Sequence, residues 1–160
     1  MIPLDEARQY VLDRVARLGS ARVPLADAAG LVLAADVVAA EQVPPFANTA
    51  MDGFAVRAAD VASVPVTLEV IGTVAAGSTL DGAVGPGQAA RIMTGAPMPD
   101  GADAVVMVEK TTLDEAAGTV LIDLSVSEGN HVRRAGEDVE PGDLLFAAGT
   151  VLTAGHLGVL

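Results

Sequence analysis

The 160-residue sequence contains no cysteine. Its absence excludes disulfide bonds, thiol catalysis and cysteine-ligated zinc or iron–sulfur sites. Aromatic residues are also scarce, with one tyrosine, three phenylalanines and no tryptophan. Because alanine and valine supply most of the apolar residues, the core must be built from small side chains that each bury little area. Apolar residues still make up 51% of the chain, which excludes an intrinsically disordered protein.

Basic residues are in short supply as well. Nine lysines and arginines stand against 21 aspartates and glutamates, which gives a net charge of −12. Such a chain offers no extended basic stripe, so nucleic acid is excluded as a partner, and so is an anionic membrane surface. An anionic ligand must therefore be held by a local group of cations or by backbone N–H groups.

Long apolar runs and a basic leader are missing too. No stretch reaches the length that a membrane-spanning helix needs. The segment from Met1 to Glu6 is acidic and has no long apolar run behind it, unlike a signal peptide. We therefore expect a soluble, cytoplasmic protein.

The N-terminal segment has the pattern of one amphipathic helix. Apolar residues recur at helical spacing from Leu4 to Leu18. Charged residues take the opposite face of this predicted helix, namely Arg8, Asp13, Arg14 and Arg17. Gly19 ends the pattern. A short turn or helix is predicted at 25–29, and part of 31–39 is interpreted as a strand.

The segment 66–125 contains short apolar runs separated by glycine and proline. This pattern predicts a small antiparallel β module with strands at 66–74, 89–93, 104–109 and 119–124. Helix and strand signals in one chain indicate an α+β fold.

The C-terminal segment is predicted to be extended at 131–134 and to form a brief strand at 144–146. Thr153 is the predicted N-cap of a helix whose pattern is still running at Leu160. We therefore expect this chain to be a fragment of a larger protein.

Common catalytic motifs are missing from the sequence. It has no phosphate-binding loop, no GxGxxG, no HExxH and no GxSxG. Without cysteine, a metal site would depend on carboxylates, which suit hard cations such as Mg²⁺. Three polar segments remain as candidates.

The first candidate lies in residues 44–57, where turn formers flank Asn48, Thr49 and Asp52. Asp52 stands between Met51 and Gly53, and two interpretations are open. The carboxylate either closes an Asx turn or is held in place for a function, as residues on such irregular segments often are.

The second candidate is Thr94-Gly95, directly after the predicted strand at 89–93. A strand end followed by these residues exposes backbone N–H groups and a hydroxyl that can bind an anion. The alternative is a plain turn, which the local pattern alone favours.

The third candidate is the pair Arg133-Arg134, followed by Glu137 and Asp138. The planar guanidinium fork suits a phosphate or another oxyanion. In a strand the two arginines point to opposite faces, so only one can line a given pocket. The alternative is a solvated pair that forms salt bridges with the neighbouring acids.

These segments together resemble a known family. Residues 44–57 (PPFANTAMDGFAVR) are similar to its motif P-x-F-D-N-S-A-M-D-G-Y-A. Residues 91–106 (RIMTGAPMPDGADAVV) are similar to R-I-x-T-G-A-x-x-P-x-G-A-D-A-V-V, and residues 132–138 (VRRAGED) to V-R-x-x-G-E-D. The family is that of the MoeA-type molybdopterin molybdenumtransferases, which includes the gephyrin E domain. The resemblance covers essentially the whole chain.

The resemblance implies an activity and partners. Family members insert molybdenum from molybdate into adenylylated molybdopterin and release AMP, assisted by Mg²⁺, and they are elongated homodimers. For this chain it implies a discontinuous linker-like α+β domain at 1–62 and 126–152, interrupted by an inserted antiparallel β domain at 63–125. Residues 153–160 would begin a downstream α/β domain. Without that domain, the chain is expected to be inactive alone.

The resemblance also implies roles for individual residues. Asp52, Thr94 and Asp138 match catalytic positions, with Asp52 and Asp138 as possible Mg²⁺ ligands. Substrate-binding roles fall to four further residues, Asn48, Thr49, Gly95 and Arg133.

Four positions depart from the family's pattern. Ala47 stands where aspartate is usual, which removes one potential ligand, and His131 stands where asparagine is common. Thr49 for serine and Phe54 for tyrosine are mild changes. Two other functions stay open, a non-catalytic dimerisation or scaffolding module and a stand-alone binder of Mg²⁺ or a small anion.

Overall fold

The computed structural model describes residues 2–16 and 18–160 and divides the chain into two units. The first unit comprises Met1–Val37 and Leu144–Leu160, and the second comprises Val38–Asp143. The charged face predicted for the N-terminal helix includes Arg17, which lies outside the described residues, as does Met1.

The N-terminal helix is shorter than its apolar pattern predicts. Helix α1 spans Leu4–Leu12, and Asp13 is its C-cap. No residue of α1 is buried, and Leu4 is 83% exposed. Because short helices gain most of their stability from a packed apolar face, the pattern beyond Leu12 is not enough to extend this one.

The rest of the first unit follows the predictions closely. The 3₁₀ helix η1 (Leu25–Asp27) falls inside the predicted turn. Strand β10 (Leu144–Phe146) pairs with β1 (Val37–Val38), the strand at which the chain passes into the second unit. Helix α2 (Ala154–Leu157) begins after Thr153, whose N–H donates to Nδ1 of His156 at 3.0 Å. Thr153 is therefore the N-cap, as predicted, but the helix ends at Leu157 with Gly158 as its C-cap and does not continue to Leu160. Over the described residues, no helix has the length and apolar character needed to cross a membrane.

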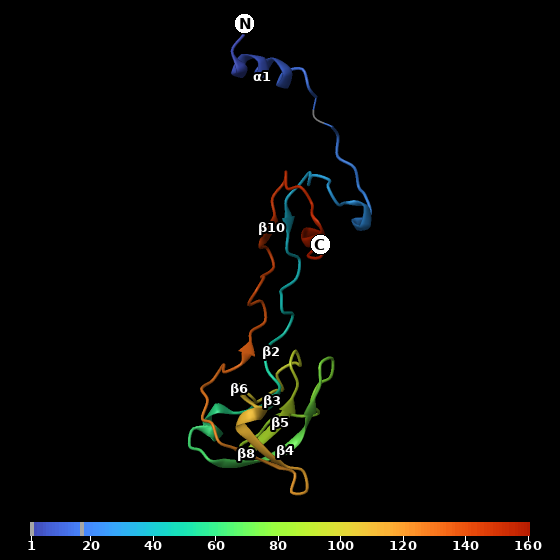
Figure 1. Ribbon diagram of the computed structural model, residues 1–160. Helices are drawn as coiled ribbons and strands as arrows, with labels where there is room; N and C mark the ends of the chain where they lie inside the picture. Colours follow the sequence, from blue (N-terminus) through green and yellow to red (C-terminus); the bar gives the residue numbers. More distant parts are fainter. Residues whose placement is uncertain (1, 17) are drawn as a thin grey trace. The chain divides into compact units, whose positions relative to one another are not determined.

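The second unit is built on a six-stranded sheet with the order β6-β3-β5-β4-β8-β7 (Figure 1). Its strands are β3 (Gly53–Val56), β4 (Val66–Val74), β5 (Gln88–Ile92), β6 (Ala104–Met107), β7 (Thr111–Asp114) and β8 (Thr119–Ile122). The 3₁₀ helix η2 (Ala58–Val61) follows β3, and η3 (Val108–Lys110) follows β6. A separate two-stranded sheet joins β2 (Asn48–Thr49) to β9 (Val132–Arg133).

The sheet corrects two expectations. Strands β4 and β5 run parallel, so the module is mixed and not wholly antiparallel. Strand β3 comes from residues 44–57, which the sequence predicts to be irregular, yet it lies between β5 and β6 and all four of its residues are buried. A strand covered on both faces shows no alternation of polar and apolar residues, which explains why the pattern did not reveal it.

The core lies on both faces of this sheet, because successive strand residues alternate between the faces. One cluster gathers around Phe54, Leu68 and Ile122, and the other around Ala55, Ile92 and Val105. Most members are valine or alanine, as the composition predicts. The sheet thus fixes the start of β3 and the end of β5, where the candidate site lies.

Candidate functional site

Gly53 fixes the position of Asp52. It is the first residue of β3 and pairs with Ile92 on one side and Met107 on the other. A Cβ at this position would lie 2.1 Å from the carbonyl oxygen of Val106, so only glycine allows the strand to approach so closely. The Asp52 carbonyl also accepts from the N–H of Val108 at 3.1 Å. The backbone at Asp52 is therefore held by the sheet itself.

The Asp52 carboxylate accepts two hydrogen bonds from Thr94. The Thr94 N–H and the Thr94 hydroxyl each donate to Oδ1 at 2.7 Å. These bonds, the backbone one first, lower the pKa of Asp52 below its ordinary value of 3.8, with a smaller contribution from the Arg91 charge. The carboxylate is therefore ionised at neutral pH.

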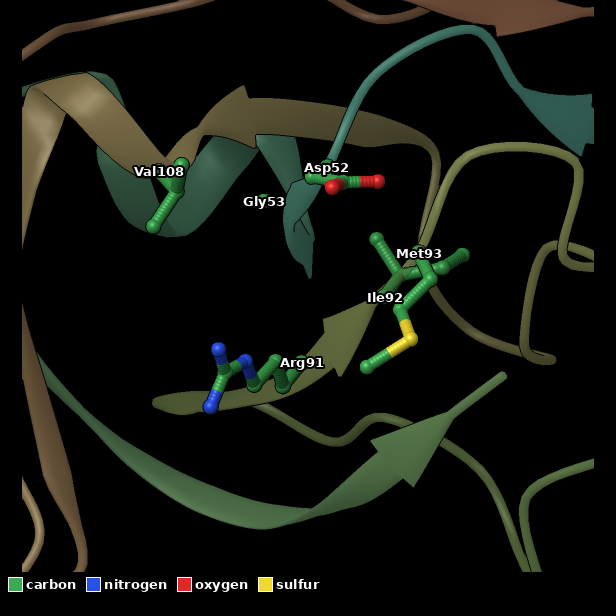
Figure 2. A pocket seen from close by; sticks show the side chains of 6 residues that line it. All are labelled: Asp52, Gly53, Arg91, Ile92, Met93 and Val108. Atoms are coloured by element: carbon green, nitrogen blue, oxygen red, sulfur yellow. The ribbon is translucent and has the colours of Figure 1, made fainter. Parts of the chain in front are cut away.

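A small hollow with a volume of about 90 Å³ opens beside this carboxylate (Figure 2). Its walls come from the start of β3, the end of β5 and the first residue of η3, and are lined by Asp52, Gly53, Arg91, Ile92, Met93 and Val108. Three of these side chains are apolar and one is cationic. Arg91 was not among the predicted site residues, although it opens the motif that contains Thr94.

The loop after β5 is bonded to β2 by backbone hydrogen bonds. Gly95 N–H donates to the Thr49 carbonyl at 2.9 Å, and Thr49 N–H donates to the Ala96 carbonyl at 3.1 Å. The Ala96 N–H donates to Met93 at 2.9 Å. Because the Thr94 N–H donates to Asp52, the N–H groups of both candidate residues, Thr94 and Gly95, have partners inside the protein. The structure favours the plain-turn interpretation of this loop.

Asn48 and Thr49 lie inside the protein. Thr49 is 1% exposed, and its hydroxyl donates to the Met51 carbonyl at 2.8 Å and accepts from the Met51 N–H at 3.1 Å. The Asn48 amide donates to the Phe46 carbonyl at 3.3 Å. Both side chains hold the turn that leads into Asp52.

Arg133 and Asp138 form an ion pair on the other side of β2. Arg133 lies opposite Asn48 in the pairing of β9 with β2. The two charged side chains are 39% and 50% exposed. Arg134 contacts a second acid through its backbone, because its N–H donates to the Glu137 carboxylate at 2.8 Å. The predicted salt bridge to a neighbouring acid is therefore present.

The candidate residues form one connected series. Asp52 binds Thr94, Gly95 binds Thr49, and Asn48 lies across from Arg133, which pairs with Asp138. Among the described residues, however, no group of three or more His, Asp or Glu side chains could hold a metal ion. Asp52 and Asp138 are thus linked through the backbone of β2 and not through a common ligand cluster.

The fold and the site together define the class of this protein. It is a region built on a mixed sheet, in which a threonine binds an ionised aspartate. Residues 2–160 match the family model of the MoeA N-terminal region, domains I and II. The chain therefore belongs to the MoeA N-terminal region family.

Named relatives agree with this membership. The chain is 40% identical over 165 residues to "Molybdopterin molybdenumtransferase" of Bacillus subtilis, covering 99% of this chain and 38% of that protein. It is 40% identical to "Molybdopterin molybdenumtransferase 2" of Mycobacterium tuberculosis, covering 99% and 40%. The crystal structure of a molybdopterin biosynthesis MoeA protein from Pyrococcus horikoshii matches with a TM-score of 0.93 and 33% identity, covering 99% and 43%. The chain thus spans about two fifths of the length of the curated relatives.

Proposed function

We propose that this chain is the N-terminal part of a molybdopterin molybdenumtransferase, which inserts molybdate into adenylylated molybdopterin and releases AMP. The observation that carries the proposal is the match over residues 2–160 to a family whose curated relatives bear that name. The ionised Asp52 beside the Thr94 hydroxyl supplies the polar chemistry that cleavage of a phosphoanhydride needs.

Within this proposal Asp52 and Thr94 act together. Both Thr94 bonds go to Oδ1 of Asp52, so this oxygen and the side-chain direction are fixed. The second oxygen, Oδ2, accepts no hydrogen bond from any residue described in the structure, and it can orient a water for attack on phosphorus. Arg133, held by Asp138, adds a guanidinium for the substrate's anionic groups.

A magnesium ion fits this arrangement in part. Mg²⁺ is commonly held by one or two carboxylates together with substrate phosphates and water. Asp52 meets this requirement because it is ionised and offers Oδ2. Asp138 is bonded to Arg133, and its role as a second ligand stays a prediction. Bound Mg²⁺ would neutralise charge that develops on the phosphate oxygens.

Assembly of the longer protein as a homodimer is part of the proposal. The apolar side chains of α1 support it, because Leu4, Val11 and Leu12 are 83%, 57% and 55% exposed. The bounds 1–62 with 126–152 for a discontinuous domain, 63–125 for an insert and 153–160 for the start of a further domain stay predictions, and the sheet joins β3, at residues 53–56, to the strands of that insert.

A chimera tests the proposed activity. Residues 2–160 replace the aligned N-terminal part of the Bacillus subtilis relative, and AMP release is measured with adenylylated molybdopterin, molybdate and Mg²⁺. We expect release by the chimera and a loss of about 100-fold or more in Asp52→Asn. Asp123→Asn is the matched control, because this carboxylate is exposed, does not line the hollow and makes no side-chain hydrogen bond or ion pair among the described residues.

Two outcomes would contradict the proposal. A folded chimera without AMP release, alongside an active parent, would favour the dimerisation or scaffolding module. Equal rates in Asp52→Asn and Asp123→Asn would exclude Asp52 from the reaction. Circular dichroism on each variant confirms that the fold is intact.

A further inference from the structure

We propose that Arg91 binds a tetrahedral oxyanion in the hollow beside Asp52. The inference rests on the proposed function and adds to it a substrate-binding residue outside the three predicted segments. The ligand is the phosphoryl group of the adenylylated substrate or molybdate itself, which share tetrahedral shape and negative charge.

Arg91 is the donor that the hollow offers. Of the six side chains that line it, Arg91 alone carries N–H groups. The backbone offers little in addition, because Met93 N–H donates to Val74 at 3.1 Å and Val108 N–H to Asp52 at 3.1 Å. The neighbouring N–H groups of Thr94 and Gly95 also have internal partners. An anion that enters the hollow must therefore be held by the guanidinium.

The guanidinium is not neutralised by an acid. In a chain with 21 acidic residues, the ion pairs among the described residues are Arg57–Asp60 and Arg133–Asp138, and neither includes Arg91. In Figure 2 the Arg91 side chain and the Asp52 carboxylate point away from each other. Two opposite charges thus stand at one hollow without forming a pair, which leaves the planar fork of Arg91 available for two parallel hydrogen bonds.

The walls and the size favour a small ligand. A volume of about 90 Å³ is well below the roughly 300–1,000 Å³ of pockets that enclose larger organic ligands, and so suits a small oxyanion better than a whole nucleotide. Ile92, Met93 and Val108 supply apolar walls, which reduce the screening of the charge.

Binding to the chain itself provides the test. Inorganic phosphate, AMP and molybdate are each titrated into the protein by calorimetry at low ionic strength, since salt weakens such contacts. We expect saturable binding of at least one of them and a loss of about tenfold or more in Arg91→Gln. Arg91→Lys, which keeps the charge and lacks the fork, should lose less than Arg91→Gln. Arg57→Gln is the matched control, because it also removes one arginine charge. Arg57 directly follows β3, at the end of the strand opposite to Asp52.

The anions identify the source of the ligand. Binding of phosphate and AMP that depends on Arg91 assigns the hollow to the substrate phosphoryl group, and binding of molybdate alone assigns it to the metal oxyanion. No binding to the unmodified chain, or equal affinities in Arg91→Gln and Arg57→Gln, overturns the inference. Since this readout needs no turnover, it is separate from AMP release by the chimera, and either proposal can fail without the other.

Discussion

Thr94 donates both its backbone N–H and its hydroxyl to the same oxygen, Oδ1 of Asp52, at 2.7 Å each. The two residues are 42 positions apart and meet because Phe54 of β3 pairs with Arg91 of β5. The arrangement holds one carboxylate oxygen and leaves the other without a hydrogen bond among the described residues. It has direct consequences for the protonation of Asp52.

The pKa of Asp52 should reflect these bonds. We expect the carboxyl carbon of Asp52 to titrate below 3.8 in an NMR experiment. Thr94→Val should raise the pKa only in part, because it removes the hydroxyl and keeps the backbone N–H, the larger of the two causes. An Asp52 that titrates at its ordinary value in the unmodified chain would contradict the geometry.

The sign of the pH dependence follows. Because the folded-state pKa of Asp52 lies below the unfolded value of 3.8, its contribution to stability is present above that value and is lost as the pH falls through the folded pKa. Urea unfolding is measured at a series of pH values. As the pH is lowered, the free energy of unfolding should decrease less in Asp52→Asn than in the unmodified chain.

Gly53 should resist substitution. In Gly53→Ala the added methyl group would meet the Val106 carbonyl oxygen at 2.1 Å, and backbone in the middle of a sheet cannot easily yield. We expect a decrease of about 2 kcal/mol or more in the free energy of unfolding, measured with urea. Gly72→Ala is the control, since its new methyl group would meet only the end of the Leu80 side chain, at 2.7 Å, which can move. Equal losses would show that the close approach of β3 is not the cause.

His131 has a left-handed backbone, with φ of 56°. This conformation is favoured by asparagine and disfavoured by β-branched residues. We expect His131→Asn to keep or increase stability and His131→Val to decrease the free energy of unfolding by about 1–2 kcal/mol. Thermal unfolding of both variants checks this. A His131→Val protein as stable as His131→Asn would disprove the backbone explanation.

The Arg133–Asp138 pair should matter little for stability. Its side chains are 39% and 50% exposed, and exposed ion pairs contribute about 0–1 kcal/mol. Arg133→Gln, Asp138→Asn and the double variant should therefore unfold within about 1 kcal/mol of the unmodified chain. If the same variants reduce AMP release in the chimera, their role is in the reaction. A coupling energy well above 1 kcal/mol would instead assign the pair to the fold.

Local signals predicted the elements that depend on local structure. Strand β4 has the predicted bounds, Val66–Val74, because a segment rich in β-branched residues lies between Pro65 and a turn. Thr153 was likewise predicted as an N-cap from a local signal, because it stands directly before a helical pattern. The extent of α1 was overestimated, because its apolar face has no buried residue and periodicity does not reveal what covers a helix.

The remaining differences come from contacts that are distant in sequence. The parallel pairing of β4 with β5 and the place of β3 between β5 and β6 are decided by tertiary packing, which no local pattern records. The contact between Asp52 and Thr94 likewise could not be predicted from the spacing of residues in the sequence. The motif resemblance pointed to both residues, and only the structure joined them. Arg91 was not among the predicted site residues, because the resemblance was carried over to Thr94 and not to the strand before it.

The segment 47–49 is bonded on both sides through its main chain, to Gly95, Ala96 and Met98 on one side and to β9 on the other. Ala47 contributes its carbonyl, an atom that every amino acid has. Replacing the family's usual aspartate with alanine at this position therefore removes a carboxylate without displacing Asp52 or Arg133. The side chain at position 47 can therefore change its chemical character while the main-chain bonds on either side keep their geometry.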